Sequence, residues 1–269
     1  MSPARGPRLA GKVAIVTGAG SRAEGIGNGR AAAILFAREG AKVLLVDQNR
    51  EWAETTLKMI EAESGEAAVC VADVTKSDEC RAMVAEAVRR WGRLDILDNN
   101  VGIGGRGTVV EMPLEEWERI MHVNVTGMML ASKHAIPAMV KGGGGAIVNI
   151  SSISALRPRG LTAYSASKGA VIALTRAMAI DHAAEGIRVN CIAPGPVETE
   201  GYLDVLTKMD KAAADKAYKS VAARVGMQRW GKVHEIAYPA IFLASDASSF
   251  ITGETIIIDG GPSPREMEG

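Results

Sequence analysis

Short apolar runs alternate with longer amphipathic stretches along nearly the whole chain of 269 residues. The short runs are rich in Val, Ile and Leu, a composition typical of strands buried on both faces. The longer stretches repeat apolar positions every three or four residues, which indicates helices. The expected strands are Lys12–Thr17, Lys42–Asp47, Ala67–Ala72, Leu94–Asn99, Ala146–Ser151, Arg188–Ala193 and Thr255–Asp259. The expected helices are Gly25–Glu39, Glu51–Glu63, Lys76–Trp91, Pro113–Val140, Thr162–Glu185 and Val233–Leu243.

This alternation predicts an α/β fold: one parallel sheet of seven strands with helices on both faces. Right-handed crossovers make it a doubly wound Rossmann-type sheet, in a single domain of residues 9–261. Residues 1–8 and 262–269 are expected to be tails, the first of them flexible. Pro137 lies inside a helical pattern and should kink or shorten that helix.

Composition narrows the classes of function. The formal net charge is zero and 47% of the residues are apolar, so the sequence favours a globular core and disfavours a nucleic-acid binder. The three cysteines are scattered, without metal-ligand spacing, so we expect no metal site and a reduced protein in the cytoplasm. We expect no membrane span either, because every apolar run is well short of about 20 residues.

The sequence Tyr164-Ser-Ala-Ser-Lys168 carries the strongest chemical signal. A Tyr and a Lys four positions apart share one face of a helix. An ammonium group beside a phenol favours the phenolate and is therefore expected to lower the phenol pKa. The pair predicts a group that moves a proton to or from an alcohol or carbonyl oxygen.

Further motifs with candidate functional residues occur before Tyr164 in the sequence. Thr17-Gly18 ends the first expected strand, and Gly25-Ile26-Gly27 opens the next helix. Asn124 follows in His-Val-Asn-Val-Thr-Gly, and Ser152 ends an apolar run twelve residues before Tyr164. From about Leu9 to Gly261, these motifs resemble the classical short-chain dehydrogenase/reductase family. The roles of the site residues are implied by this resemblance, except where a physical reason supports them.

The resemblance implies a catalytic set of Asn124, Ser152, Tyr164 and Lys168. Ser152 would donate a hydrogen bond to the substrate oxygen, and Tyr164 would give or take the proton. Lys168 would bond the nicotinamide ribose, while Asn124 would hold a water that links Lys168 to solvent. Ser151 is the rival of Ser152, which is preferred because the family's serine is normally the second of such a pair.

A glycine-rich turn between a strand and a helix can bind a pyrophosphate at the helix N-terminus. Gly18, Gly25, Ile26 and Gly27 are the residues expected here. Six residues separate Gly18 from Gly25 where the family has three, so the loop should be longer, and Gly20 is a partial substitute.

Asp47 ends the second expected strand, where a carboxylate accepts hydrogen bonds from ribose hydroxyls and repels a 2′-phosphate. NAD is therefore favoured as the cofactor, although Arg22 and Arg50 leave NADP open. The alternative for Asp47 is a cap of the following helix.

The resemblance assigns further cofactor-binding positions. Asp73 and Val74 would bracket the adenine, with a helix cap as the alternative. Asn100 and Gly102 would lie beside the ribose, and Tyr164 and Lys168 also contact the cofactor. Near the nicotinamide the expected residues are Pro194, Val197 and Thr199, with helix capping as the alternative for Thr199.

Residues 198–226 should form a substrate lid. Arg106, Arg157 and Arg159 lie in loops beside the expected pocket and could clamp an anionic substrate, or be solvated. Leu156, Tyr202, Leu203 and Met209 are candidates for apolar walls.

Taken together, these features predict an NAD(P)-dependent oxidoreductase that interconverts a secondary alcohol and a ketone. The alternatives are a 3-oxoacyl-carrier-protein-type reductase that uses NADPH and a non-catalytic dinucleotide-binding regulatory protein. The resemblance also implies a homotetramer, formed through the helices that carry Asn124 and Tyr164 and through the C-terminal segment.

Overall fold

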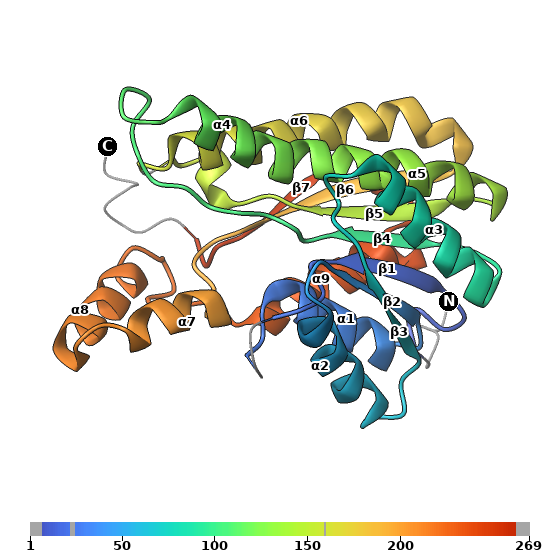
Figure 1. The fold of residues 1–269 in the computed structure, drawn as a ribbon, viewed down its shortest axis with the longest axis horizontal. Helices are drawn as coiled ribbons and strands as arrows, with labels where there is room; N and C mark the ends of the chain where they lie inside the picture. Colours follow the sequence, from blue (N-terminus) through green and yellow to red (C-terminus); the bar gives the residue numbers. More distant parts are fainter. Residues whose placement is uncertain (1–6, 22–24, 159, 262–269) are drawn as a thin grey trace.

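The computed structural model describes residues 7–21, 25–158 and 160–261. Seven strands form one parallel sheet in the order β3-β2-β1-β4-β5-β6-β7, which confirms the predicted doubly wound fold (Figure 1). The order reverses between β1 and β4, where ligands bind in such sheets. The strands are β1 (Val13–Thr17), β2 (Lys42–Asp47), β3 (Ala67–Val71), β4 (Ile96–Asn99), β5 (Gly145–Ile150), β6 (Ile187–Pro194) and β7 (Thr255–Ile258).

Helices cover both faces of the sheet and bury a separate core on each (Figure 1). One face carries α1 (Asn28–Arg38), α2 (Arg50–Glu61) and α9 (Val233–Ala244). The other carries α3 (Ser77–Trp91), α5 (Gly127–Lys141) and α6 (Thr162–His182). Strand residues such as Val43 and Leu44 are fully buried and point to opposite cores, which explains their uninterrupted apolar sequence.

The helix expected at residues 113–140 is divided. α4 (Leu114–Met121) passes into a π-helical turn, His122–Thr126, before α5 begins. π turns inside helices are frequent at functional sites, and this one carries Asn124. Pro137 does not shorten the helix as predicted, because α5 continues through it to Lys141.

Residues 198–226 fold into α7 (Glu200–Thr207) and α8 (Lys211–Ala222), which project from the body of the molecule (Figure 1). Trp230 lies beneath them, with its ring centroid 4.3 Å from that of Tyr202 and 5.4 Å from that of Tyr218. Its indole nitrogen donates a hydrogen bond to the carbonyl oxygen of Tyr218 at 3.0 Å. This aromatic stack anchors the projecting pair of helices.

Asp98 is an unexpected residue in the centre of the sheet. It lies in β4, opposite Val16 of β1 and Val148 of β5, and is fully buried. Neither carboxylate oxygen has a hydrogen-bond partner among the described residues. Burial raises the pKa of Asp98 to about 7.

The raised pKa makes stability depend on pH. In the unfolded chain the pKa of an Asp is about 3.9. Between that pH and about 7, the unfolded chain therefore releases a proton that the folded chain retains. Asp98 therefore destabilises the fold increasingly as pH rises through this window. We expect Asp98→Asn to raise the free energy of unfolding by up to roughly 4 kcal/mol more at pH 8 than at pH 4. Urea denaturation at both pH values measures this, with the exposed Asp78→Asn as control. A gain that is the same at both pH values would contradict the assignment.

Candidate active site

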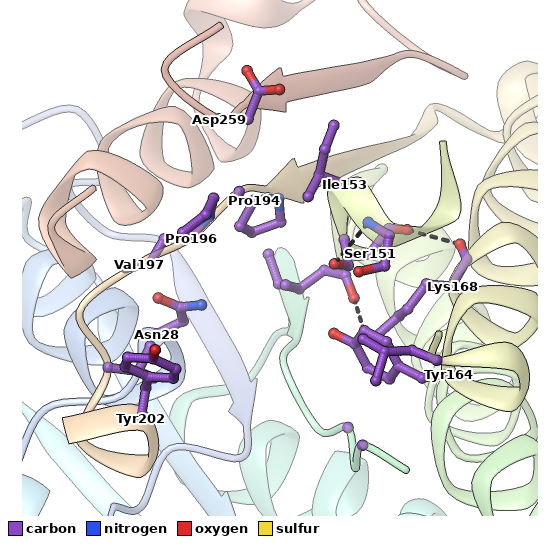
Figure 2. A pocket seen from close by; sticks show the side chains of 18 of the residues that line it. Asn28, Ser151, Ile153, Tyr164, Lys168, Pro194, Pro196, Val197, Tyr202 and Asp259 are labelled. Carbon is purple, nitrogen blue, oxygen red and sulfur yellow. Dashed lines mark hydrogen bonds between the residues drawn. The ribbon is translucent and has the colours of Figure 1, made fainter. Parts of the chain in front are cut away.

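A cavity of about 920 Å³ opens at the carboxyl ends of the strands. Figure 2 shows Tyr164 and Lys168 on one side of it and Asn28, Val197 and Tyr202 on the other. The lining includes eight of the predicted catalytic and cofactor-binding positions: Asn100, Gly102, Ser152, Tyr164, Lys168, Pro194, Val197 and Thr199. Ser151, the rival of Ser152, and Tyr202, a predicted wall residue, line it as well.

α6 positions Tyr164 and Lys168 on the same wall, as their spacing predicts. Lys168 is almost completely buried, and its Nζ donates a hydrogen bond to the carbonyl oxygen of Ile150 at 2.8 Å. The same Nζ lies 5.8 Å from the centroid of the Tyr164 ring. The end of β5 therefore holds the ammonium group close to the phenol.

The pKa of Tyr164 differs from the expectation. Burial raises it, while a hydrogen bond with the Ser152 side chain acts in the opposite direction. Burial also lowers the pKa of Lys168 to about 8. The Tyr164 pKa is therefore raised, and not lowered as the pairing with Lys168 predicts, because the loss of hydration at the buried phenol dominates.

The two serines after β5 have different surroundings. Ser151 Oγ donates a hydrogen bond to the backbone carbonyl of Lys168 at 2.7 Å, which ties β5 to α6. Ser152 Oγ accepts a hydrogen bond from the amide of Ser154 at 3.1 Å. The Ser152 side chain is also hydrogen-bonded to the side chain of Tyr164. Ser152 is thus the serine placed beside the phenol, and Ser151 supports the scaffold.

Asn124 joins three elements of the site. Its Oδ1 accepts a hydrogen bond from Ile103 N at 2.8 Å, and its Nδ2 donates to Ile103 O and to Ser167 Oγ, each at 2.9 Å. A Cβ on Gly102 would lie 3.0 Å from Lys168 Nζ and 3.5 Å from Asn124 Oδ1. The loop after β4 therefore approaches the lysine closely, which Gly102 permits.

The glycine turn between β1 and α1 is displaced from its predicted position. α1 begins at Asn28, with Gly27 as its N-cap, and not at Gly25. Gly18 has φ +66°, and a Cβ on Gly29 would lie only 2.1 Å from the Gly18 carbonyl oxygen. Gly29 is thus the glycine that lets helix and strand approach, and sequence reasoning missed it; the Gly27-Asn28-Gly29 spacing was the available signal.

Gly25 and Ile26 lie instead where the loop meets α7. A Cβ on Gly25 would collide with the Glu200 side chain at 2.2 Å, and the Glu200 amide donates to Ile26 O at 3.3 Å. Arg22 and Glu24, within the lengthened loop, lie outside the described residues.

Arg30 binds both ends of the lengthened loop and is fully buried. Its guanidinium donates to the carbonyls of Ser21 at 2.8 Å and of Gly25. It also donates to Trp52 O at 3.0 Å and Thr56 Oγ1 at 2.9 Å, both in α2. Burial lowers the pKa of Arg30, and the neighbouring Glu200 and Asp47 carboxylates oppose this. The sequence reasoning did not identify this residue.

The predicted adenosine-side residues lie at the carboxyl ends of β2 and β3, next to this loop. Asp47 accepts hydrogen bonds from the amides of Gly20 at 3.0 Å and Asn49 at 2.9 Å. Asn49, and not Asp47, caps α2. Asp73 accepts from the Thr75 amide and hydroxyl, and the N-cap of α3 is Lys76, so the capping alternatives for both aspartates are wrong. Val74 is buried against Gly127.

The residues present fit a dinucleotide. Asn28 Oδ1 and Asn100 Nδ2 are buried polar atoms without a hydrogen-bond partner among the described residues, and both side chains line the cavity. They flank the N-terminus of α1, where free amides favour a pyrophosphate. Among the described residues no cluster of metal-ligating side chains occurs, and no helix is long and apolar enough to cross a membrane.

The segment after β6 completes the wall opposite Tyr164. Pro194, Val197 and Thr199 all line the cavity, and Val197 is held by a bridge to Gly231. Thr199 is the N-cap residue of α7, as the capping alternative predicts, but its hydroxyl makes no capping hydrogen bond.

The apolar wall differs in part from the prediction. Tyr202 lines the cavity, whereas Leu156, Leu203 and Met209 are exposed and do not. The wall is completed by Ile153, Leu161, Val205, Val225 and Trp230. Arg106 and Arg157 line the cavity as predicted, Arg224 joins them, and Arg159 lies outside the described residues.

The chain is similar to many dehydrogenases and reductases. Residues 20–263 match the family model described as Enoyl-(Acyl carrier protein) reductase. An uncharacterized oxidoreductase of Thermotoga maritima is 42% identical over 93% of this chain and 97% of its own. The 3-oxoacyl-acyl-carrier-protein reductase FabG of the same organism is 38% identical over 94% of this chain and 98% of its own.

Solved structures of dehydrogenases also superpose closely on this chain. A short-chain dehydrogenase/reductase from Burkholderia xenovorans superposes with a TM-score of 0.91 at 39% identity, covering 95% of this chain and 97% of its own. A 7α-hydroxysteroid dehydrogenase, complexed with NADH and 7-oxo glycochenodeoxycholic acid, superposes with a TM-score of 0.86 at 34% identity, covering 98% of both chains. The chain thus belongs to the short-chain dehydrogenase/reductase family and is an NAD(P)-dependent oxidoreductase that acts on CH–OH groups.

Proposed function

We propose that the protein interconverts a secondary alcohol and a ketone, with Tyr164 as the proton-transfer group and NAD as the preferred cofactor. The observation that carries this proposal is the convergence of Ser152, Tyr164 and Lys168 on one wall of a cavity. The opposite wall contains the N-terminus of α1 and the turn after β6. Substrate and nicotinamide would meet between them.

When bound, the nicotinamide accepts or supplies the hydride at the carbon that bears the oxygen. Tyr164 takes the hydroxyl proton during alcohol oxidation and returns it during ketone reduction. Without substrate, the Ser152 hydroxyl is hydrogen-bonded to Tyr164 and lowers the Tyr164 pKa. When substrate binds, the single Ser152 proton would instead be donated to the substrate oxygen. Lys168, held by Ile150 O, places its positive charge where the nicotinamide ribose and the phenol meet.

In this proposal Asn124 positions the backbone of the loop that follows β4. Its side chain fixes the amide and carbonyl of Ile103, next to Gly102 in the wall of the cavity. Its Oδ1 keeps a lone pair that can bind the water proposed to link Lys168 to solvent.

NAD preference is proposed from Asp47. Each of its oxygens accepts one backbone hydrogen bond and so keeps a lone pair for a ribose hydroxyl. A 2′-phosphate would bring negative charge beside a carboxylate that is already largely buried. Arg50, the described candidate for binding such a phosphate, lies 3.5 Å from Glu54 in an ion pair.

Titration with NADH and NADPH, followed by cofactor fluorescence, tests this preference. We expect NADH to bind at least about tenfold more tightly, because an unfavourable charge pair of this kind changes affinity by about 1.4 kcal/mol or more. Asp47→Asn should reduce the preference, and the exposed Glu61→Gln in α2 should not. Tighter NADPH binding by the parent protein would instead favour a reductase of 3-oxoacyl-carrier-protein type, the activity named for the FabG relative.

The proposed assembly is a homotetramer. Ile180 of α6 is 80% exposed and Phe250, shortly before β7, is fully exposed. Leu114 of α4 and Ile257 of β7 are exposed as well. These apolar side chains lie on the elements expected to form the subunit contacts, and light scattering of the purified protein measures the assembly.

The three cysteines are free, which supports the proposed cytoplasmic location.

A further inference from the structure

Three arginines from three separate loops line the cavity. Arg106 follows β4, Arg157 follows the short helical turn after β5, and Arg224 follows α8. We infer that the substrate carries an anionic group, such as a carboxylate, sulfonate or phosphate, which these arginines bind. This inference rests on the proposed function and names the class of alcohol or ketone that the site accepts.

The backbone segments that carry the arginines are joined to one another. Gly107 forms a bridge with Leu161 and accepts a hydrogen bond from the Thr162 amide at 3.3 Å, so the loop of Arg106 lies against the loop of Arg157. The Gly226 amide donates to Gly261 O at 2.9 Å, which attaches the segment of Arg224 to the end of β7.

Asp259 lies between two of these segments. It accepts hydrogen bonds from Arg157 Nη1 and from the Gly261 amide, both at 2.9 Å. Figure 2 shows Asp259 well away from Tyr164, at another end of the cavity. Arg157 and Asp259 therefore lie in a part of the cavity apart from the reacting oxygen, where a second group of the substrate would bind.

The charges in this region do not cancel. Asp259 is the single acidic side chain among the described residues that line the cavity, and it already pairs with Arg157. Arg106 and Arg224 are exposed, and no ion pair to either is found within the described part of the chain. A cavity with two such cations attracts an anion by charge and by the planar donor geometry of guanidinium.

The cofactor does not account for these cations. Its pyrophosphate is expected at the N-terminus of α1, beside Asn28 and Gly29, where backbone amides supply the donors. Arg106, Arg157 and Arg224 instead belong to the loops that follow β4, β5 and α8.

A panel of matched ketones tests the inference: 3-oxobutanoate, 4-oxopentanoate and 5-oxohexanoate, each against its methyl ester. The three lengths cover different separations of ketone and carboxylate. We expect kcat/KM to be at least about tenfold higher for the best acid than for its ester, mainly through a lower KM. Added salt should raise the KM of the acid and not that of the ester.

Arginine variants then locate the anion. Arg224→Gln and Arg106→Gln should each lower the acid-to-ester ratio by about tenfold, because a charge-assisted hydrogen bond is lost. Arg89→Gln, on the distant surface of α3, is the matched control and should leave the ratio unchanged. Asp259→Asn should raise the ratio, since it removes a negative charge from this part of the cavity.

Binding of the same panel to the enzyme–NADH complex, measured by calorimetry, separates the two proposals. Esters that are reduced as well as the acids, or bound as well, would overturn the anionic substrate and leave the oxidoreductase proposal intact. Ketones that bind to the complex but are never reduced would instead count against the proposed reaction. An acid preference that survives both arginine substitutions would also overturn the inference.

Discussion

Tyr164→Phe is expected to abolish turnover while the fold and cofactor binding remain. The substitution removes one hydroxyl from a side chain that is partly buried against the cavity. Without it, no described group of comparable acidity lies beside Ser152, so the rate should fall by about 10³-fold or more. NADH binding, followed by fluorescence, should change by less than about threefold.

The control for this experiment is Tyr238→Phe. Tyr238 lies in α9 and is half exposed, away from the cavity lining. Its loss should leave kcat and KM unchanged. Activity retained by Tyr164→Phe, in a protein that binds NADH normally, would show that another group moves the proton.

Arg30→Met is expected to disrupt the lengthened glycine loop. The substitution keeps an apolar stem of similar length but removes the donors to Ser21 O, Gly25 O, Trp52 O and Thr56 Oγ1. Buried acceptors left without donors cost about 1–3 kcal/mol each, so the free energy of unfolding should fall by roughly 3 kcal/mol or more. NADH should bind at least about tenfold more weakly, because the loop precedes the N-terminus of α1.

Arg38→Met in the same helix is the matched control. Arg38 lies at the exposed end of α1 and pairs with Glu63, a surface contact worth about 1 kcal/mol or less. Arg30→Lys should restore little, because a single ammonium cannot reach four acceptors in three segments. If Arg30→Met unfolds and binds NADH like Arg38→Met, Arg30 does not organise the loop.

Much of the fold could be predicted from the sequence because the signals are local. β2 matches its predicted range, β4 begins two residues later than predicted, and β5 is shifted by one residue at both ends. Runs such as Val43-Leu-Leu-Val46 are apolar on both faces and leave few alternatives to a central parallel strand. The spacing of Tyr164 and Lys168 placed them on one wall for the same reason, since helix geometry alone decides it.

Other features depend on neighbours that are distant in the sequence. The predicted start of α1 lies three residues too early, because the sequence alone does not distinguish the role of Gly25 from that of Gly29. Only contact with the Gly18 carbonyl, and the Glu200 side chain over Gly25, distinguish their roles. The π turn at Asn124 likewise has no local breaker, and Pro137, the obvious one, does not end its helix.

The chain by itself therefore determined the sheet, the order of its motifs and the shared helix face of Tyr164 and Lys168, because strand burial and helical spacing act over a few positions. The tertiary structure decided the rest. It gave Arg30 its four acceptors, reversed the expected pKa shift of Tyr164 and assembled Arg106, Arg157 and Arg224 around one cavity. Burial and charge at those positions are set by segments up to a hundred or so residues apart, which no local pattern encodes.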